Sequence, residues 1–135
     1  MTKRTYKTEK DVKAQVKKLL DAHGFYWWMP PANGYGKSGA ADIMALRDGL
    51  FLAIETKFGT RKPTAMQKAF LQSILAHDGM AFVVSDRTVD AFETWLKEFD
   101  AAAAQVAGGQ KVDPARGAAM LDAIAVLTEQ MVSGR

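Results

Sequence analysis

The sequence predicts an α/β fold in which a mixed sheet is flanked by helices. Two apolar runs, 41–46 and 50–56, flank Asp48-Gly49, a dipeptide that favours a two-residue type I′ turn because both of its residues need positive φ. These runs therefore predict an antiparallel hairpin. A helical pattern then leads to another apolar run at 80–84, and such a crossover adds a fourth strand to the same sheet. With a helix at each end and a strand before the hairpin, the predicted order is αβββαβα.

The first elements have clear local signals. Thr8 is a candidate N-cap for a helix that runs to about Ala22, with Gly24 ending it. We expect Val12, Val16, Leu19 and Leu20 to form its core stripe. The aromatic run 25–29 predicts the first strand, and we expect its side chains to belong to the core rather than to a nucleic-acid stacking platform.

The second half of the chain continues the pattern. Thr64 opens a helix to about His77, and Thr64-x-x-Gln67 is a capping-box pattern. Apolar residues between 89 and 99 mark a final core helix. From Asp100 the composition becomes rich in Ala and Gly, and Asp113-Pro114 is typical of the start of a further helix, to about Met131. We expect a core at 1–100, with a linker and an extra C-terminal helix at 101–135 appended to the same domain. The buried face expected for the helix that Thr64 opens consists of Ala65, Ala69, Phe70 and Ile74.

Composition narrows the classes of function. The 135 residues are 48% hydrophobic, which is enough for one domain with a real core. The absence of cysteine excludes disulfides, thiol catalysis and Cys-ligated zinc, and two histidines are too few for a His-rich metal site, so any metal must be bound by oxygen. No run is long enough to span a membrane, and the N-terminus lacks the apolar region of a signal peptide. We therefore expect a cytoplasmic protein.

The predicted hairpin brings two carboxylates together. The turn fixes a register in which Asp42 faces Glu55, in a pair whose Cα atoms lie roughly 4.5 Å apart. Like charges directly opposite each other destabilise a sheet, so this pair requires a cation. A hard divalent ion, Mg²⁺ or Mn²⁺, satisfies that need with oxygen ligands, and Lys57 lies on the same face as a fixed positive neighbour.

Positive charge is concentrated at the N-terminus. The first 18 residues carry seven Lys and Arg against two acids, in a chain of net charge +3. This pattern suits binding to a phosphate backbone, although a solvated lysine-rich helix face is an alternative. The Gly-rich loop 32–39 precedes Asp42 and has the composition of a phosphate-approaching loop. It lacks Walker A spacing, so we expect no nucleotide cofactor. The candidate DNA-binding residues are Lys3, Arg4, Lys7, Lys37, Ser38, Arg61 and Lys62.

An ordered set of motifs resembles a known nuclease family. Gly39-x-x-Asp42, then Glu55-Thr56-Lys57, then Gln67 at a helix start resemble the PD-(D/E)XK nuclease core, and in particular its virus-type replication-repair (VRR-NUC) branch. The resemblance covers about residues 8–100 and implies the αβββαβα core. One departure is Ala41, where the name of the motif has Pro. The resemblance implies metal-dependent hydrolysis of DNA by an endonuclease.

Roles for individual residues follow from this resemblance. It implies that Asp42, Glu55 and the backbone carbonyl of Thr56 hold the metal, and that Lys57 orients the attacking water. It places an active-site acid in the first helix, where Glu9 lies on the core stripe, to assist directly or through water; the alternative is that Glu9 complements the helix N-terminus. Gln67 is either an active-site residue or only a cap.

Several functions remain open at this point. Stand-alone domains that look like this one resemble Holliday-junction resolvases, which implies a homodimer acting on branched DNA in repair. A phage-type or restriction-like endonuclease acting on flaps, ends or specific sequences is one alternative. A non-catalytic DNA-binding module with a vestigial site is another. The preferred metal, the number of metal ions, the substrate geometry and the cut position are not determined by the sequence.

Overall fold

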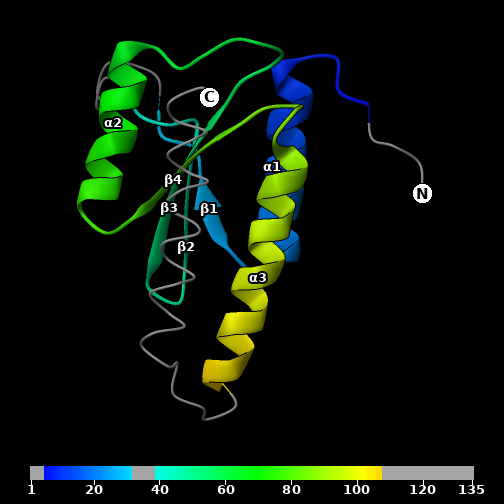
Figure 1. Cartoon of the computed structure of the whole chain (residues 1–135), viewed down its shortest axis with the longest axis vertical. Coiled ribbons are helices and arrows are strands. Elements are labelled where there is room, and N and C mark those ends of the chain that lie inside the picture. Colours follow the sequence, from blue (N-terminus) through cyan, green and yellow to red (C-terminus); the bar gives the residue numbers. More distant parts are fainter. Residues whose placement is uncertain (1–4, 32–38, 108–135) are drawn as a thin grey trace.

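The computed structural model describes residues 5–31 and 39–107 (Figure 1). Within these ranges the elements are α1 (Glu9–Ala22), β1 (Tyr26–Trp28), β2 (Ile43–Arg47), β3 (Leu50–Thr56), α2 (Ala65–Ala76), β4 (Met80–Val84) and α3 (Val89–Ala107). The strands form one sheet in the order β1-β2-β3-β4. β1, β2 and β3 are successively antiparallel, and β4 is parallel to β3. The predicted α/β class, mixed sheet and αβββαβα order are confirmed.

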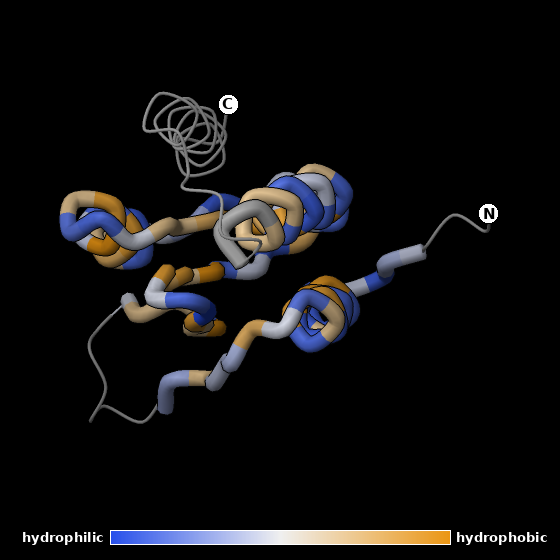
Figure 2. Tube along the Cα trace, turned by 90° about the horizontal axis from the view of Figure 1, so that it is seen from below, coloured by the Kyte–Doolittle hydropathy of each residue, from blue (hydrophilic) through white to orange (hydrophobic). Residues whose placement is uncertain are grey.

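Helices cover the sheet on both faces, with α1 and α3 on one side and α2 on the other (Figures 1 and 2). Strand alternation explains this division, because successive side chains of β3 point to opposite faces. Leu52 and Ile54 join the core formed with α1 and α3, whereas Ala53 joins the smaller core against α2. The predicted core stripe of α1 is buried as expected.

The hairpin has the predicted turn and register. Asp48 and Gly49 adopt φ angles of 51° and 82°, as a type I′ turn requires. Ile43 pairs with Ile54, and β2 begins one residue after Asp42. Extending this register by one residue sets Asp42 across from Glu55, at the end of β2 and β3 that is remote from the turn.

The aromatic stretch 25–29 corrects one prediction, because only part of it belongs to the core. Phe25 is buried and Trp27 packs against the main core, but Tyr26 and Trp28 point to the opposite face and are 70% and 36% exposed. β1 is an edge strand, and the described helix on that face, α2, packs against β3 and β4. Burial within this strand therefore depends on which face each side chain takes.

The buried face of α2 also differs from the prediction. Leu71 is the buried residue of this helix, while Phe70 and Ile74 are only partly buried and Ala65 and Ala69 are exposed. Ala53 and Ala81 present small side chains on the facing part of the sheet, and Leu71 packs there together with the partly buried Phe70, Ile74 and Leu75. The contact stripe of the helix therefore includes Leu71 and Leu75 in place of Ala65 and Ala69.

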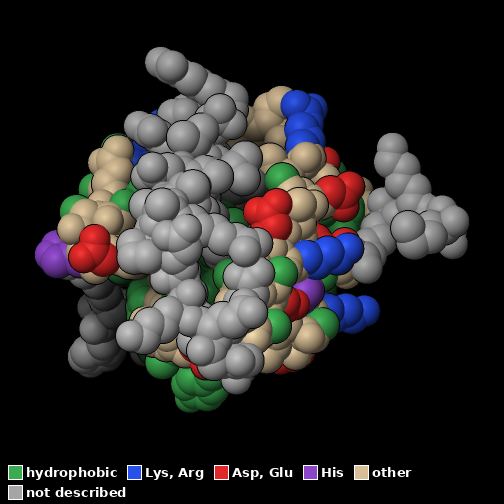
Figure 3. Space-filling view, turned by 60° about the horizontal axis from the view of Figure 1, so that its bottom comes forward, with side chains coloured by type: hydrophobic (Ala, Val, Ile, Leu, Met, Phe, Trp, Pro, Cys, Tyr) green, Lys and Arg blue, Asp and Glu red, His purple; other side chains and the backbone are tan. Residues whose placement is uncertain are grey.

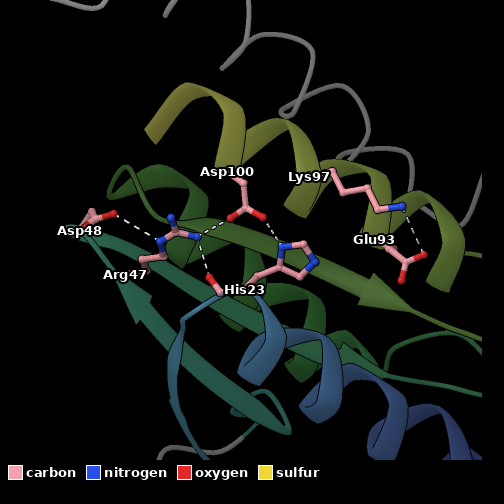
Figure 4. Close-up of polar contacts among 6 residues, drawn as sticks. All are labelled: His23, Arg47, Asp48, Glu93, Lys97 and Asp100. Carbon is pink, nitrogen blue, oxygen red and sulfur yellow. Dashed lines mark hydrogen bonds and ion pairs between the residues drawn. The ribbon is translucent and has the colours of Figure 1, made fainter. Parts of the chain in front are cut away.

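α3 continues to Ala107, beyond the predicted core boundary at residue 100. Its alanine run is a strong helix former, which explains why the helix does not end at the composition change. Asp100 is held within it by a polar cluster (Figure 4): Arg47 donates hydrogen bonds to Asp100 and to the carbonyl oxygen of His23, and the His23 ring pairs with Asp100. Burial alone raises the pKa of Asp100, but the hydrogen bonds from Arg47 and His23 outweigh it and lower the pKa below its ordinary value. The cluster thus ties β2 and the end of α1 to α3.

Several predicted features lie outside the described residues. They are the C-terminal helix at 113–131, most of the Gly-rich loop, and Lys3, Arg4, Lys37 and Ser38. No helix in the described part of the chain is both long enough and apolar enough to cross a membrane.

Candidate functional site

The predicted site residues meet where β2 begins and β3 ends. Asp42 directly precedes β2, and Glu55 and Thr56 are the last two residues of β3. Lys57 continues the sheet by donating its backbone N–H to the carbonyl oxygen of Val84, at 3.0 Å. α2 starts beside this edge, so its first turn can supply a further side chain.

Asp42 is oriented by the neighbouring strand. One of its carboxylate oxygens, Oδ2, accepts hydrogen bonds from the backbone N–H of Thr56 at 3.0 Å and from its Oγ1 at 2.7 Å. The other, Oδ1, lies 3.8 Å from Lys13 Nζ on α1. Sequence reasoning assigned Thr56 only a carbonyl ligand and missed its role in fixing Asp42. A residue with a hydroxyl donor, at the end of a strand that is otherwise largely apolar, was the available signal for it.

Glu55 is nearly inaccessible to solvent, with 2% of its surface exposed. Its Oε1 accepts a hydrogen bond from Gln67 Nε2 at 2.9 Å and lies 3.7 Å from Lys57 Nζ. Its Oε2 is buried and has no hydrogen-bond partner in the described part of the chain. Burial, followed by the charge on Asp42, raises the pKa of Glu55 to about 8, even though the ammonium of Lys57 acts in the opposite direction. A carboxylate oxygen without a partner is costly in a buried position, so this atom is available to a ligand.

Gln67 caps α2 and also contacts Glu55. Its Oε1 accepts from the backbone N–H of Thr64 at 2.8 Å and completes the capping box of α2. Its Nε2 donates to Glu55. Because the amide group has a donor end and an acceptor end, one side chain fixes the helix start and the carboxylate together.

A close backbone contact holds the segment before Asp42. Gly39 has φ of 76°, and a Cβ added there would lie 2.5 Å from the carbonyl oxygen of Met66 in the first turn of α2. Only glycine combines this backbone conformation with such a close approach. The backbone segment that leads to Asp42 therefore packs against α2, the helix that carries Gln67.

α1 also contributes a cation to the site, which the sequence prediction did not include. Among the described residues, no group of three or more His, Asp or Glu side chains is placed to hold a metal ion, so Glu9 does not join Asp42 and Glu55 in such a cluster. Glu9 is half-buried in the first turn of α1. Lys13, one helical turn later on the same face, is the α1 residue that reaches Asp42. Its spacing of four residues from Glu9 was the available signal.

The described members of the candidate DNA-binding set lie outside this cluster. Lys7 is exposed just before the N-cap of α1, and Arg61 and Lys62 are exposed in the loop before α2. This loop leads from Lys57 to Thr64, so two cations flank the start of the helix that contacts Glu55.

The sequence was also compared with known proteins. No family model and no curated protein matched it.

Proposed function

We propose that the chain is a divalent-metal-dependent DNA endonuclease with a PD-(D/E)XK core of the VRR-NUC type. The observation that carries the proposal is the buried Oε2 of Glu55, which has no hydrogen-bond partner among the described residues, on a carboxyl group next to Asp42 and Lys57. In a purely structural site we would expect a donor for that oxygen. A site for a hard cation instead leaves such an oxygen open.

The donor set fits Mg²⁺ or Mn²⁺, which prefer carboxylate and carbonyl oxygen. Asp42, Glu55 and the backbone carbonyl of Thr56 would hold the ion, with Glu9 acting through water. When bound, such an ion supplies Lewis acidity for attack of water on a phosphodiester. The charges of the two carboxylates decide the fit. A bound cation would offset the repulsion between Asp42 and Glu55 and would give Oε2 of Glu55 a partner.

The remaining residues position charge. Thr56 holds Asp42 by two hydrogen bonds, and Gln67 holds Glu55 while capping α2. Lys57 is 7% exposed, so its ammonium acts in a site largely free of water, where it would orient the attacking water and stabilise the charge that develops on the phosphate oxygens. Lys13 balances the charge on Asp42 from the other side.

We propose branched DNA as the substrate, with a homodimer as the acting form. The exposed Arg61 and Lys62 beside the site support contact with a phosphate backbone. The resemblance to junction resolvases supports the two-fold assembly, since paired sites suit symmetric cuts.

The test is cleavage of labelled four-way junction, flap and linear duplex in Mg²⁺, Mn²⁺ or EDTA. We expect metal-dependent cleavage of branched DNA, and its loss in Asp42→Asn. Asp48→Asn is the matched control: it makes the same change in the same hairpin at an exposed turn residue whose positive φ asparagine tolerates. Undiminished cleavage by Asp42→Asn contradicts the site. DNA binding without cleavage in either metal would instead indicate a non-catalytic module.

A further inference from the structure

A group of apolar side chains is exposed on the face of the sheet that α2 only partly covers. Tyr26 and Trp28 on β1 and Leu46 on β2 are 70%, 36% and 40% exposed. The Tyr26 and Trp28 rings are 5.7 Å apart, and Trp28 packs edge-on against Phe51, which is 6.0 Å away on β3. We call Tyr26, Trp28, Leu46 and Phe51 the β1 aromatic face.

The sheet topology explains why α2 leaves this face uncovered. β1 is an edge strand, and α2 packs over β3 and β4, toward the opposite edge of the same face (Figure 2). Hydrophobic side chains project at the lower edge of the view in Figure 3, and Lys and Arg side chains appear mainly to the right. Apolar side chains that gather on a surface, rather than scatter singly, mark an interaction site.

The β1 aromatic face is continuous with the candidate site. Trp28 pairs with Met44, and Asp42 lies two residues before Met44, directly ahead of β2. Extending the strand register sets Trp28 and Asp42 as diagonal neighbours, about 7–8 Å apart between Cα atoms. Strand alternation sets Glu55 and Lys57 on the α2 face of β3, as the hydrogen bond from Gln67 to Glu55 shows. Trp28 lies on this same face, because it contacts Phe51.

We infer that the β1 aromatic face stacks the unpaired bases of a DNA strand whose backbone passes over the Asp42, Glu55 and Lys57 site. This inference rests on the proposed function and names its substrate class: DNA with a single-stranded segment next to the cleaved bond. Trp28 takes the base nearest the site and Tyr26 the following one. The bases of a duplex are paired and stacked on one another, so their faces are not available to these rings.

Chemistry favours this occupant. Single-strand binding surfaces combine aromatic rings, on which every base can stack, with cations that follow the backbone. The β1 aromatic face supplies two exposed rings, and Lys13, Lys57, Arg61 and Lys62 supply cations at the site end. Bases flanking the scissile phosphate would therefore stack on the rings, while their phosphates would pair with ammonium and guanidinium groups.

The experiment measures binding to fluorescent oligothymidylate and to a blunt duplex in EDTA, so that no cleavage is needed. Trp28→Ala combined with Tyr26→Ala should weaken oligothymidylate binding about thirtyfold or more, because two stacked bases are lost and each is worth about fivefold or more. The preference for single strand over duplex should fall by the same factor. Trp28→Phe should retain most of the affinity, since phenylalanine still offers a ring.

Intrinsic fluorescence provides a matched control within one strand. Trp27 neighbours Trp28 but faces α1, where it donates a hydrogen bond to Asp21 and lies under Lys17. Trp95 is buried. Oligothymidylate should therefore quench Trp27→Phe much as it quenches the wild type, whereas the quench should disappear in Trp28→Phe.

Two outcomes would overturn the inference. One is an unchanged affinity of the double alanine variant for oligothymidylate. The other is dissociation of a dimer in sedimentation, caused by the same two substitutions, with the affinity for single strand intact, which would make this face a subunit interface. Because binding is measured without metal, a protein that stacks single strands but never cleaves them contradicts only the proposed function.

Discussion

Replacing Glu55 with glutamine should remove a pH dependence from the stability of the metal-free protein. In the wild type, burial and the charge on Asp42 raise the pKa of Glu55 from 4.5 to about 8. The folded state therefore retains a proton that the unfolded chain releases. This contribution to stability is fully present below pH 4.5 and is lost as the pH rises through about 8.

The size of the effect follows from the shift. Each pKa unit corresponds to about 1.4 kcal/mol, so between pH 5 and pH 9 the wild type should lose on the order of 4 kcal/mol of unfolding free energy through this group. For a domain of this size that is roughly 10–15 °C in melting temperature. Glutamine cannot ionise, so Glu55→Gln should lack this component and should be the more stable protein at pH 9.

The assay is thermal unfolding in EDTA at pH steps from 5 to 9. Glu98→Gln is the control, because Glu98 is exposed on α3 and its loss should leave the wild-type slope unchanged. Other titrating groups contribute to both proteins, so the difference between wild type and Glu55→Gln isolates Glu55. Excess Mg²⁺ or Mn²⁺ should then raise the melting temperature of the wild type at pH 8 but not that of the variant. Parallel pH profiles for wild type and Glu55→Gln would refute the reasoning.

Three further predictions concern other contacts. Lys57→Met should retain Mn²⁺ binding in calorimetry but slow single-turnover cleavage by about 10²-fold or more, because it removes a preorganised charge; full cleavage would contradict this role. Gln67→Ala and Thr64→Ala should each lower the free energy of unfolding in urea by about 1 kcal/mol, because each breaks the capping box. Only Gln67→Ala should also slow cleavage, since only Gln67 contacts Glu55. Equal activity of the two variants would leave Gln67 as a cap alone. Arg47→Met should lower the free energy of unfolding by roughly 2–3 kcal/mol, because Arg47 donates hydrogen bonds to His23 and Asp100. Cleavage per folded molecule should not change, since these contacts do not involve the site residues. A stability equal to that of the wild type would show that the polar cluster contributes nothing.

Elements with local signals could be predicted from the residues alone. The Asp48-Gly49 turn fixed the register of β2 and β3, and that register set Asp42 across from Glu55. Thr8 and Thr64 marked the starts of α1 and α2 because each cap is complete within four residues. Such features depend on backbone conformation and on neighbours in the chain, which a single sequence contains.

Which distant side chains contact one another depends on how the elements pack. Lys13 reaches Asp42 because the packing of α1 on the sheet brings that turn of the helix to it. Tyr26 and Trp28 are exposed because α2 covers the part of their face formed by β3 and β4. The residue pattern of β1 alone does not predict this. The raised pKa of Glu55 likewise depends on burial and on charges brought from other elements. Packing geometry sets these contacts, and a pattern of residue types along the chain does not contain it.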